Sequence, residues 1–176
     1  AKLERLTEEA VRNVQAAKKP GAKAPDKLAC GCAGTQVRSL AQESAGQDAP
    51  AQPGRLQNWP VQLQLVPVRA PYFGGCDLLI AADCTAYACG SFHADFIRGR
   101  VTLIGCPKLD RADYEEKLTA ILTENDVRSV TLTRMEVPCC GGLEYAARQA
   151  VAASGKDIPM RVVTFTAEGE ILPQDA

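Results

Sequence analysis

Residues 129–142, S-V-T-L-T-R-M-E-V-P-C-C-G-G, decide how this chain is to be interpreted. The hydrophobic first part predicts a strand, which ends at the adjacent Cys139 and Cys140 and is followed by two glycines. Adjacent cysteines bond to each other only with strain, because a disulfide needs a Cβ geometry that neighbouring residues supply poorly. We therefore interpret both thiols, on a strand-to-helix turn, as metal ligands, and we expect the metal to be iron.

Strand-like and helix-like segments alternate from residue 61 onward, which predicts an α/β fold with a mostly parallel sheet. Residues 78–82 are continuously apolar, as in a central strand that is buried on both faces. Residues 61–65 alternate apolar side chains with glutamines, which predicts an edge strand with one wet face. We expect an open, Rossmann-like sheet of about five strands with helices on both faces. The other expected strands are 101–105, 130–137 and 161–166.

Two helices are predicted from apolar side chains at helical spacing. One begins near Tyr114 and has Asp110 or Asp113 as its cap, and the other follows the double cysteine and ends at Gly155. A third and less regular helix is expected between Cys84 and Ile97.

The length of 176 residues suits one core and an irregular extension. We expect residues 1–55 to form the extension, with a short helix over 3–17, a Cys30-Gly31-Cys32 motif and a flexible linker over 41–54. The predicted α/β domain then covers residues 56–176.

Charge and hydropathy exclude several classes of partner. The formal net charge is -1, and no basic stripe with interleaved aromatic residues predicts contact with nucleic acid. The longest apolar run, 78–82, is far shorter than a membrane helix, and the first residues are too charged for a signal peptide. We expect a cytoplasmic protein.

Its eight cysteines are then expected to bind metal or act in catalysis rather than form disulfides, because cytosolic thiols are kept reduced.

Four cysteines follow predicted strands directly. Cys84 follows 78–83, Cys106 follows 101–105, and Cys139 with Cys140 follows 130–137. Ligands of open parallel sheets bind outside the carboxyl ends of the strands. Four thiols from three turns are therefore expected at one edge of the sheet.

A set of four thiolates suits a 4Fe-4S cluster or a structural zinc ion. The start of a helix favours anionic thiolates, and the two glycines after Cys140 let backbone amides approach sulfur closely. Structural zinc usually draws on compact C-x2-4-C pairs, and here only Cys84 and Cys89 have such a spacing. We expect an iron-sulfur cluster, with zinc as the alternative.

The other cysteines and the lone histidine receive different interpretations. Cys76 precedes its strand and would lie on the order of 20 Å from the ligand edge, so we expect a buried or free thiol. Cys89 is expected to pack, and His93 to lie at the surface or pack rather than bind. Cys30 and Cys32 are too close for an ordinary chelate, but they suit the bridging of two irons or the capping of a cluster. They could also form a redox-active dithiol or an interaction loop.

Several segments together resemble an iron-sulfur protein family of anaerobic bacteria and archaea, in which such a domain follows an N-terminal ferredoxin module. They are residues 79–87, 92–93, 104–110 and 135–142. Residues 30–34, C-G-C-A-G, resemble the family's C-G-C-P-G signature, with Ala33 in place of proline, whereas the ferredoxin cysteine run is absent. The resemblance implies a ferredoxin-type electron donor or acceptor, as a partner or as a module of the same protein. The cysteines that it implies as cluster ligands are Cys30, Cys32, Cys84, Cys106, Cys139 and Cys140.

A weaker resemblance is to the Cys-Cys-Gly domain of heterodisulfide reductases, whose double cysteine follows a single cysteine by thirty-odd residues. Cys106 and Cys139 have thirty-two residues between them, but the later C-x-x-C of that pattern is missing. This resemblance implies a non-cubane or larger cluster in which Cys139 or Cys140 bridges irons.

Three hypotheses of function follow. The first is an iron-sulfur protein that transfers electrons to or from a ferredoxin-type module or partner. The second is an oxidoreductase whose cluster reduces a small substrate or a disulfide. The third is an interaction module that zinc stabilises or that a thiol switch controls.

Overall fold

The computed structural model describes Leu40 and residues 53–173. The helix predicted over 3–17, the Cys30-Gly31-Cys32 motif and nearly all of the predicted linker lie outside the described residues. Among the described helices, none is long and apolar enough to cross a membrane.

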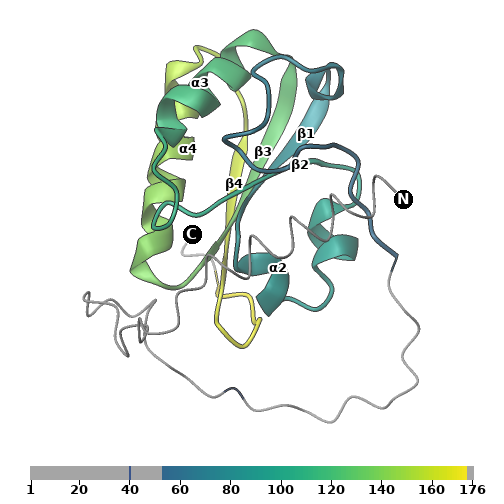
Figure 1. Cartoon of the computed structure of the whole chain (residues 1–176), viewed down its shortest axis with the longest axis vertical. Helices are drawn as coiled ribbons and strands as arrows, with labels where there is room; N and C mark the ends of the chain where they lie inside the picture. Colours follow the sequence, from purple (N-terminus) through teal and green to yellow (C-terminus); the bar gives the residue numbers. More distant parts are fainter. Residues whose placement is uncertain (1–39, 41–52, 174–176) are drawn as a thin grey trace, which may run out of the picture. The chain divides into compact units, whose positions relative to one another are not determined.

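Four parallel strands form an open sheet in the order β2-β1-β3-β4 (Figure 1). Leu78 to Ala82 of β1 are buried, because β1 has a strand on each side and helices above and below. The predicted Rossmann-like fold with a central strand at 78–82 is thereby confirmed. The strands are β1 (Cys76–Ala82), β2 (Val101–Gly105), β3 (Val127–Met135) and β4 (Met160–Phe165).

The strand predicted at 61–65 is wrong in its extent, and the sheet has four strands rather than about five. Residues 61–65 lie along the free edge of β2, as expected of an edge strand, but they form a single parallel bridge, between Gln62 and Ile104. The Ile104 N–H donates to Val61 O at 2.8 Å, and the Leu63 N–H donates to Ile104 O at 2.9 Å. The chain then turns after Gln62, where the Leu65 and Val66 amides donate back to the Gln62 carbonyl.

The side chain of buried Asn58 pairs with the remainder of the β2 edge. Its Oδ1 accepts from the Thr102 N–H at 2.8 Å, and its Nδ2 donates to Thr102 O at 3.0 Å and to Pro60 O at 3.1 Å. One amide side chain thus replaces a strand partner beside Pro60, whose nitrogen has no hydrogen to donate. This explains why the sheet edge is satisfied without a fifth strand.

The two regular helices lie where the sequence predicts them. Helix α3 (Tyr114–Glu124) begins after Asp113, whose carboxylate accepts from the Glu116 N–H at 3.0 Å. Helix α4 (Gly141–Ala153) is followed by Gly155, whose φ of 69° is the expected left-handed conformation. The predicted third helix is instead split into α2 (Thr85–Ala88) and a π-helix, His93–Ile97. Two 3₁₀ helices, Pro71–Phe73 and Pro138–Cys140, complete the described structure.

Helices cover both faces of the sheet, as predicted. Helices α3 and α4 pack against each other along one face of the sheet (Figure 1). On this face, Arg134 of β3 pairs with Glu144 of α4. The other face carries α2, whose Thr85 hydroxyl lies 3.2 Å from that of Thr133, and the π-helix, whose Phe96 ring packs against Phe165 of β4. Thr133 and Arg134 are neighbours in β3, so their side chains point to opposite faces.

The chain that follows β1 crosses one face of the sheet, and the chain that follows β3 crosses the other. The chain passes from β1 through α2 to β2, returns through α3 to β3 on the far side of β1, and continues through α4 to β4. The carboxyl ends of β1 and β3 therefore flank the point at which the winding direction reverses, which is where open α/β sheets bind ligands.

We predict that Asn58→Ala destabilises the domain by about 1–3 kcal/mol, because the Thr102 amide and carbonyl lose their partner in a buried position. Urea denaturation followed by circular dichroism measures the change. Gln57→Ala, at the exposed neighbouring position, is the matched control and should change stability by less than about 0.5 kcal/mol. Equal effects of the two substitutions would contradict the role of Asn58.

Candidate metal centre

The turns after β1 and β2 are joined at their first residues. Cys84 is the N-cap of α2, and Cys106 directly follows β2. The Asp83 N–H donates to Gly105 O at 3.2 Å, so the pairing of the two strands continues to the residues just before the cysteines. The structure thus places Cys84 and Cys106 on neighbouring turns of the same edge, as the sequence predicts.

The double cysteine lies in the 3₁₀ helix Pro138–Cys140, which leads directly into α4. Gly142, in the first turn of α4, lies against the turn after β2. A Cβ on Gly142 would come within 3.3 Å of Pro107 Cβ, so a larger residue would press the two turns apart. The glycine thereby allows the start of α4 to approach the residue after Cys106.

A pair of buried threonines fixes the turn of Cys84 against β3. The Thr85 hydroxyl donates to Ala82 O at 2.8 Å and lies 3.2 Å from the Thr133 hydroxyl. Because Thr85 follows Cys84 directly, these contacts hold the first turn of α2 beside the end of β3. No sequence pattern predicts this pair, because the contact spans 48 residues.

Charge effects show that the four thiols share one region. Burial raises the pKa of Cys84, and Cys106, Asp83 and Cys139 raise it further. Burial also raises the pKa of Cys140 to about 11, against a backbone hydrogen bond that lowers it. The other three thiols add to that rise. Such effects decline with distance, so cysteines that are far apart in sequence lie near one another at this edge.

The thiols differ in exposure, and their side chains are not arranged as a finished ligand set. Cys84 is exposed, Cys106 and Cys139 are half-buried, and Cys140 is buried. Among residues 40 and 53–173, no group of three or more His, Cys, Asp or Glu side chains is placed so that it could hold a metal ion. Four thiols are the kind of donors that a thiophilic metal or cluster takes. To enclose such a group, these side chains would have to turn toward one another.

Asp110 and Tyr114 form a contact beneath the Cys106 turn that the sequence did not reveal. Asp110 was expected only as one of two caps for the helix, and Asp113 fills that place. The Asp110 carboxylate instead accepts from the Tyr114 hydroxyl and from the Cys106 N–H, the latter at 3.2 Å. The hydrogen bond from Tyr114 holds the pKa of Asp110 below its ordinary value.

Arg134 and Arg148 enclose the carboxylate of Glu144 beside the start of α4. Arg134 Nη1 lies 2.5 Å from Glu144 Oε2, and Arg148 Nη2 lies 2.9 Å from Oε1. Burial opposes ionisation of Glu144, yet the two guanidinium groups hold its pKa below the ordinary value. Arg134, near the end of β3, is therefore already paired with a carboxylate.

The residues that were not expected to bind make contacts of their own. Cys76 is the first residue of β1 rather than a residue before it, at the amino end of the sheet. Cys89 is buried behind α2, with its sulfur 3.7 Å from the Ser91 hydroxyl. His93 Nδ1 accepts from the Arg55 N–H at 3.1 Å. Cys30 and Cys32 lie outside the described residues, so their part in a site stays a prediction.

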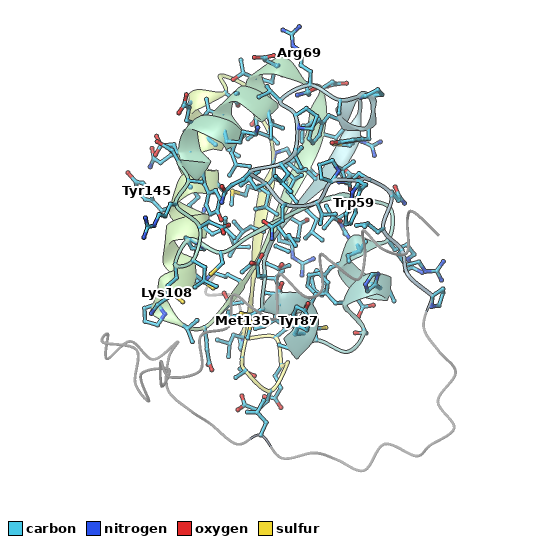
Figure 2. The ribbon with its side chains drawn as sticks, viewed as in Figure 1. Trp59, Arg69, Tyr87, Lys108, Met135 and Tyr145 are labelled. Carbon is cyan, nitrogen blue, oxygen red and sulfur yellow. The ribbon has the colours of Figure 1, made fainter. Side chains whose placement is uncertain are left out.

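Side chains from the three turns lie at one end of the fold. Figure 2 shows Tyr87 of α2, Met135 at the end of β3 and Lys108 of the turn after β2 toward the same end, and Arg69 at the other. The parallel register accounts for this, because Ala82 of β1 pairs with Gly105 of β2.

This arrangement is that of a Rossmann-like α/β domain with cysteines on the turns after three strands. The chain belongs to the Rossmann-like domain family, which it matches over residues 70–176. It is 31% identical over 119 residues to an uncharacterized protein of Archaeoglobus fulgidus, which covers 67% of this chain and 84% of the archaeal protein. No solved structure gives a significant match. Family membership agrees with the observed fold.

Alkylation of the metal-free protein tests the environment of Cys76. Burial and the neighbouring Asp77 raise the pKa of its thiol from 9.0 to about 11. Because the thiolate is the reactive form, we predict that iodoacetamide at pH 8 modifies Cys76 about 100-fold more slowly in the folded than in the unfolded chain. Peptide mass spectrometry measures both rates, and equal rates would contradict this environment.

Proposed function

We propose that this domain binds an iron-sulfur cluster and transfers electrons to or from a ferredoxin-type partner or module. Cys84, Cys106, Cys139 and Cys140 are the proposed ligands, and Cys30 and Cys32 are proposed as additional or capping ligands. One observation carries the proposal: the parallel strands and their joined turns bring four thiols to one edge of the sheet, where Cys106 and Cys139 raise the pKa of Cys84 and the other three thiols raise the pKa of Cys140. A 4Fe-4S cluster, or a larger or non-cubane one, needs this kind of donor set.

The surroundings of the double cysteine support anionic sulfur. Helix α4 has 13 residues and directs its first amide groups and the positive end of its dipole toward Cys139 and Cys140. Gly141 has no side chain, and nothing lies within 4 Å of the position that a Cβ would take, so the space beside these amides is open. Metal binding would remove the thiol protons that burial favours in the free protein.

The exposure of one proposed ligand supports electron transfer as the activity. Cys84 is exposed, so a bound cluster would have one ligand close to the surface, where a partner could approach. A cluster supplies single-electron exchange, and the chain supplies its ligands and its access.

The proposed setting follows from the sequence. The segments 79–87, 104–110 and 135–142 resemble iron-sulfur proteins of anaerobes in which a ferredoxin module precedes this domain. We also propose that the protein is cytoplasmic, as expected from its sequence. A zinc ion on the same thiols is the competing proposal, since zinc also accepts four thiolates.

Anaerobic reconstitution with iron and sulfide tests the proposal. We predict that the full chain becomes coloured and retains both elements after desalting. Cys140→Ser should lower the retained iron by at least about tenfold, because a buried thiolate ligand is lost, while Cys76→Ser, on the other end of β1, should retain it. Iron and sulfide analysis measures occupancy, and circular dichroism confirms that the variants fold.

Two results would contradict the proposal. One is a colourless wild-type protein without iron after reconstitution. The other is zinc in protein that has never been exposed to oxygen, bound through the same cysteines and not displaced by iron and sulfide.

A further inference from the structure

Asp110 holds both backbone polar groups of Cys106. Its carboxylate Oδ2 accepts from the Cys106 N–H at 3.2 Å, and its own N–H donates to Cys106 O at 2.9 Å. These contacts close a tight turn over residues 106–110, in which the Leu109 N–H also donates to Cys106 O at 3.1 Å. The direction in which the Cys106 side chain leaves the backbone is therefore set by Asp110.

Tyr114 orients the Asp110 carboxylate from below. Its side chain is buried, and its hydroxyl donates to the same Oδ2 that accepts from Cys106. Gly105 makes this approach feasible, because a Cβ there would lie 2.6 Å from the Tyr114 hydroxyl oxygen and 2.9 Å from Cζ. A glycine before the cysteine and a tyrosine eight residues after it thus belong to one contact.

Capping of α3 does not account for Asp110. The cap is Asp113, whose Oδ1 accepts from the Glu116 N–H at 3.0 Å. Asp110 precedes the helix by four residues, and its carboxylate is directed at Cys106 instead. Two aspartates three residues apart therefore have separate tasks.

We propose that Asp110, oriented by Tyr114, is a positioning residue that fixes Cys106 for metal binding and lowers the reduction potential of the bound cluster. The second part rests on the proposed function. The carboxylate occupies the Cys106 amide, and hydrogen bonds from amides to sulfur are one of the factors that set cluster potentials. Its negative charge beside a ligand also disfavours the arrival of an electron.

Amide exchange at Cys106 in the metal-free full chain tests the positioning by itself. We expect Asp110→Ala to accelerate exchange at this amide by at least about tenfold, because its acceptor is an ionised carboxylate. Tyr114→Phe should accelerate it by a smaller factor, since the carboxylate remains but loses its orientation. Exchange followed by NMR at residue level gives these rates.

Asp113→Ala is the matched control for this measurement. It removes the cap of α3 and lowers the stability of the domain, and the Asp113 carboxylate accepts from the Glu116 N–H rather than from Cys106. In this variant, the Cys106 amide should exchange at a rate within a factor of about ten of the wild-type rate. When the two variants are compared at equal stability, this amide should exchange more slowly in Asp113→Ala than in Asp110→Ala. Equal acceleration by the two variants at equal stability would overturn the positioning.

The reduction potential of the cluster-loaded full chain tests the charge effect. Asp110→Asn keeps the shape and an acceptor oxygen but removes the charge, so we expect a higher midpoint potential than in the wild type. The shift should exceed that of Asp113→Asn, and a shift that is absent, downward or equal in both variants overturns the effect. A wild-type chain that takes up no iron overturns the proposed function and the potential effect together, while the exchange rates still decide the positioning.

Discussion

The parallel pairing of β1 with both β2 and β3 is the constraint on which the rest of the structure depends. Pairing runs from Leu78 with Val101 to Ala82 with Gly105 on one side, and through Ala81 with Thr133 on the other. Strands that run in the same direction and in this register end together. Every turn that follows them is consequently delivered to the same edge, whatever its distance along the chain.

The contacts at that edge convert a shared location into a shared site. Gly142 lies against Pro107, Thr85 lies against Thr133, and Asp83 continues the pairing of β1 with β2. The first and third contacts each join two of the three cysteine-bearing turns, and the second holds the turn of Cys84 against β3. The thiols of Cys84 and Cys140 keep their protons more readily than free cysteines, because burial raises the pKa of both, and a bound metal would displace those protons.

The fold was predictable where one residue pattern had one structural meaning. The continuously apolar run at 78–82 is too short for a typical buried helix and therefore predicted a strand buried on both faces, which β1 confirms. Alternation at 61–65 was ambiguous, because an edge segment that bridges at one residue shows the same pattern as a full strand. Only the contact of Asn58 with Thr102 distinguishes them, and that contact spans 44 residues.

The candidate site, like the fold, was predictable from the sequence only in part. The positions of Cys84, Cys106, Cys139 and Cys140 after their strands were predictable, since parallel strands present their carboxyl ends together. The order of the strands, which puts β1 between β2 and β3, was not. Nor was the use of Asp110, because a helix-start pattern offers two aspartates and gives no reason to prefer Asp113 as the cap. The motif at Cys30 and Cys32 stays a prediction.

The measurement that tests the central claim most directly is anomalous diffraction at the iron edge from crystals of the full chain grown without oxygen. The account predicts iron peaks at the edge bounded by Cys84, Cys106, Cys139 and Cys140, with sulfur of these cysteines in the first coordination sphere. Iron bound elsewhere on the domain, or an iron-free edge in crystals of reconstituted protein, would contradict it.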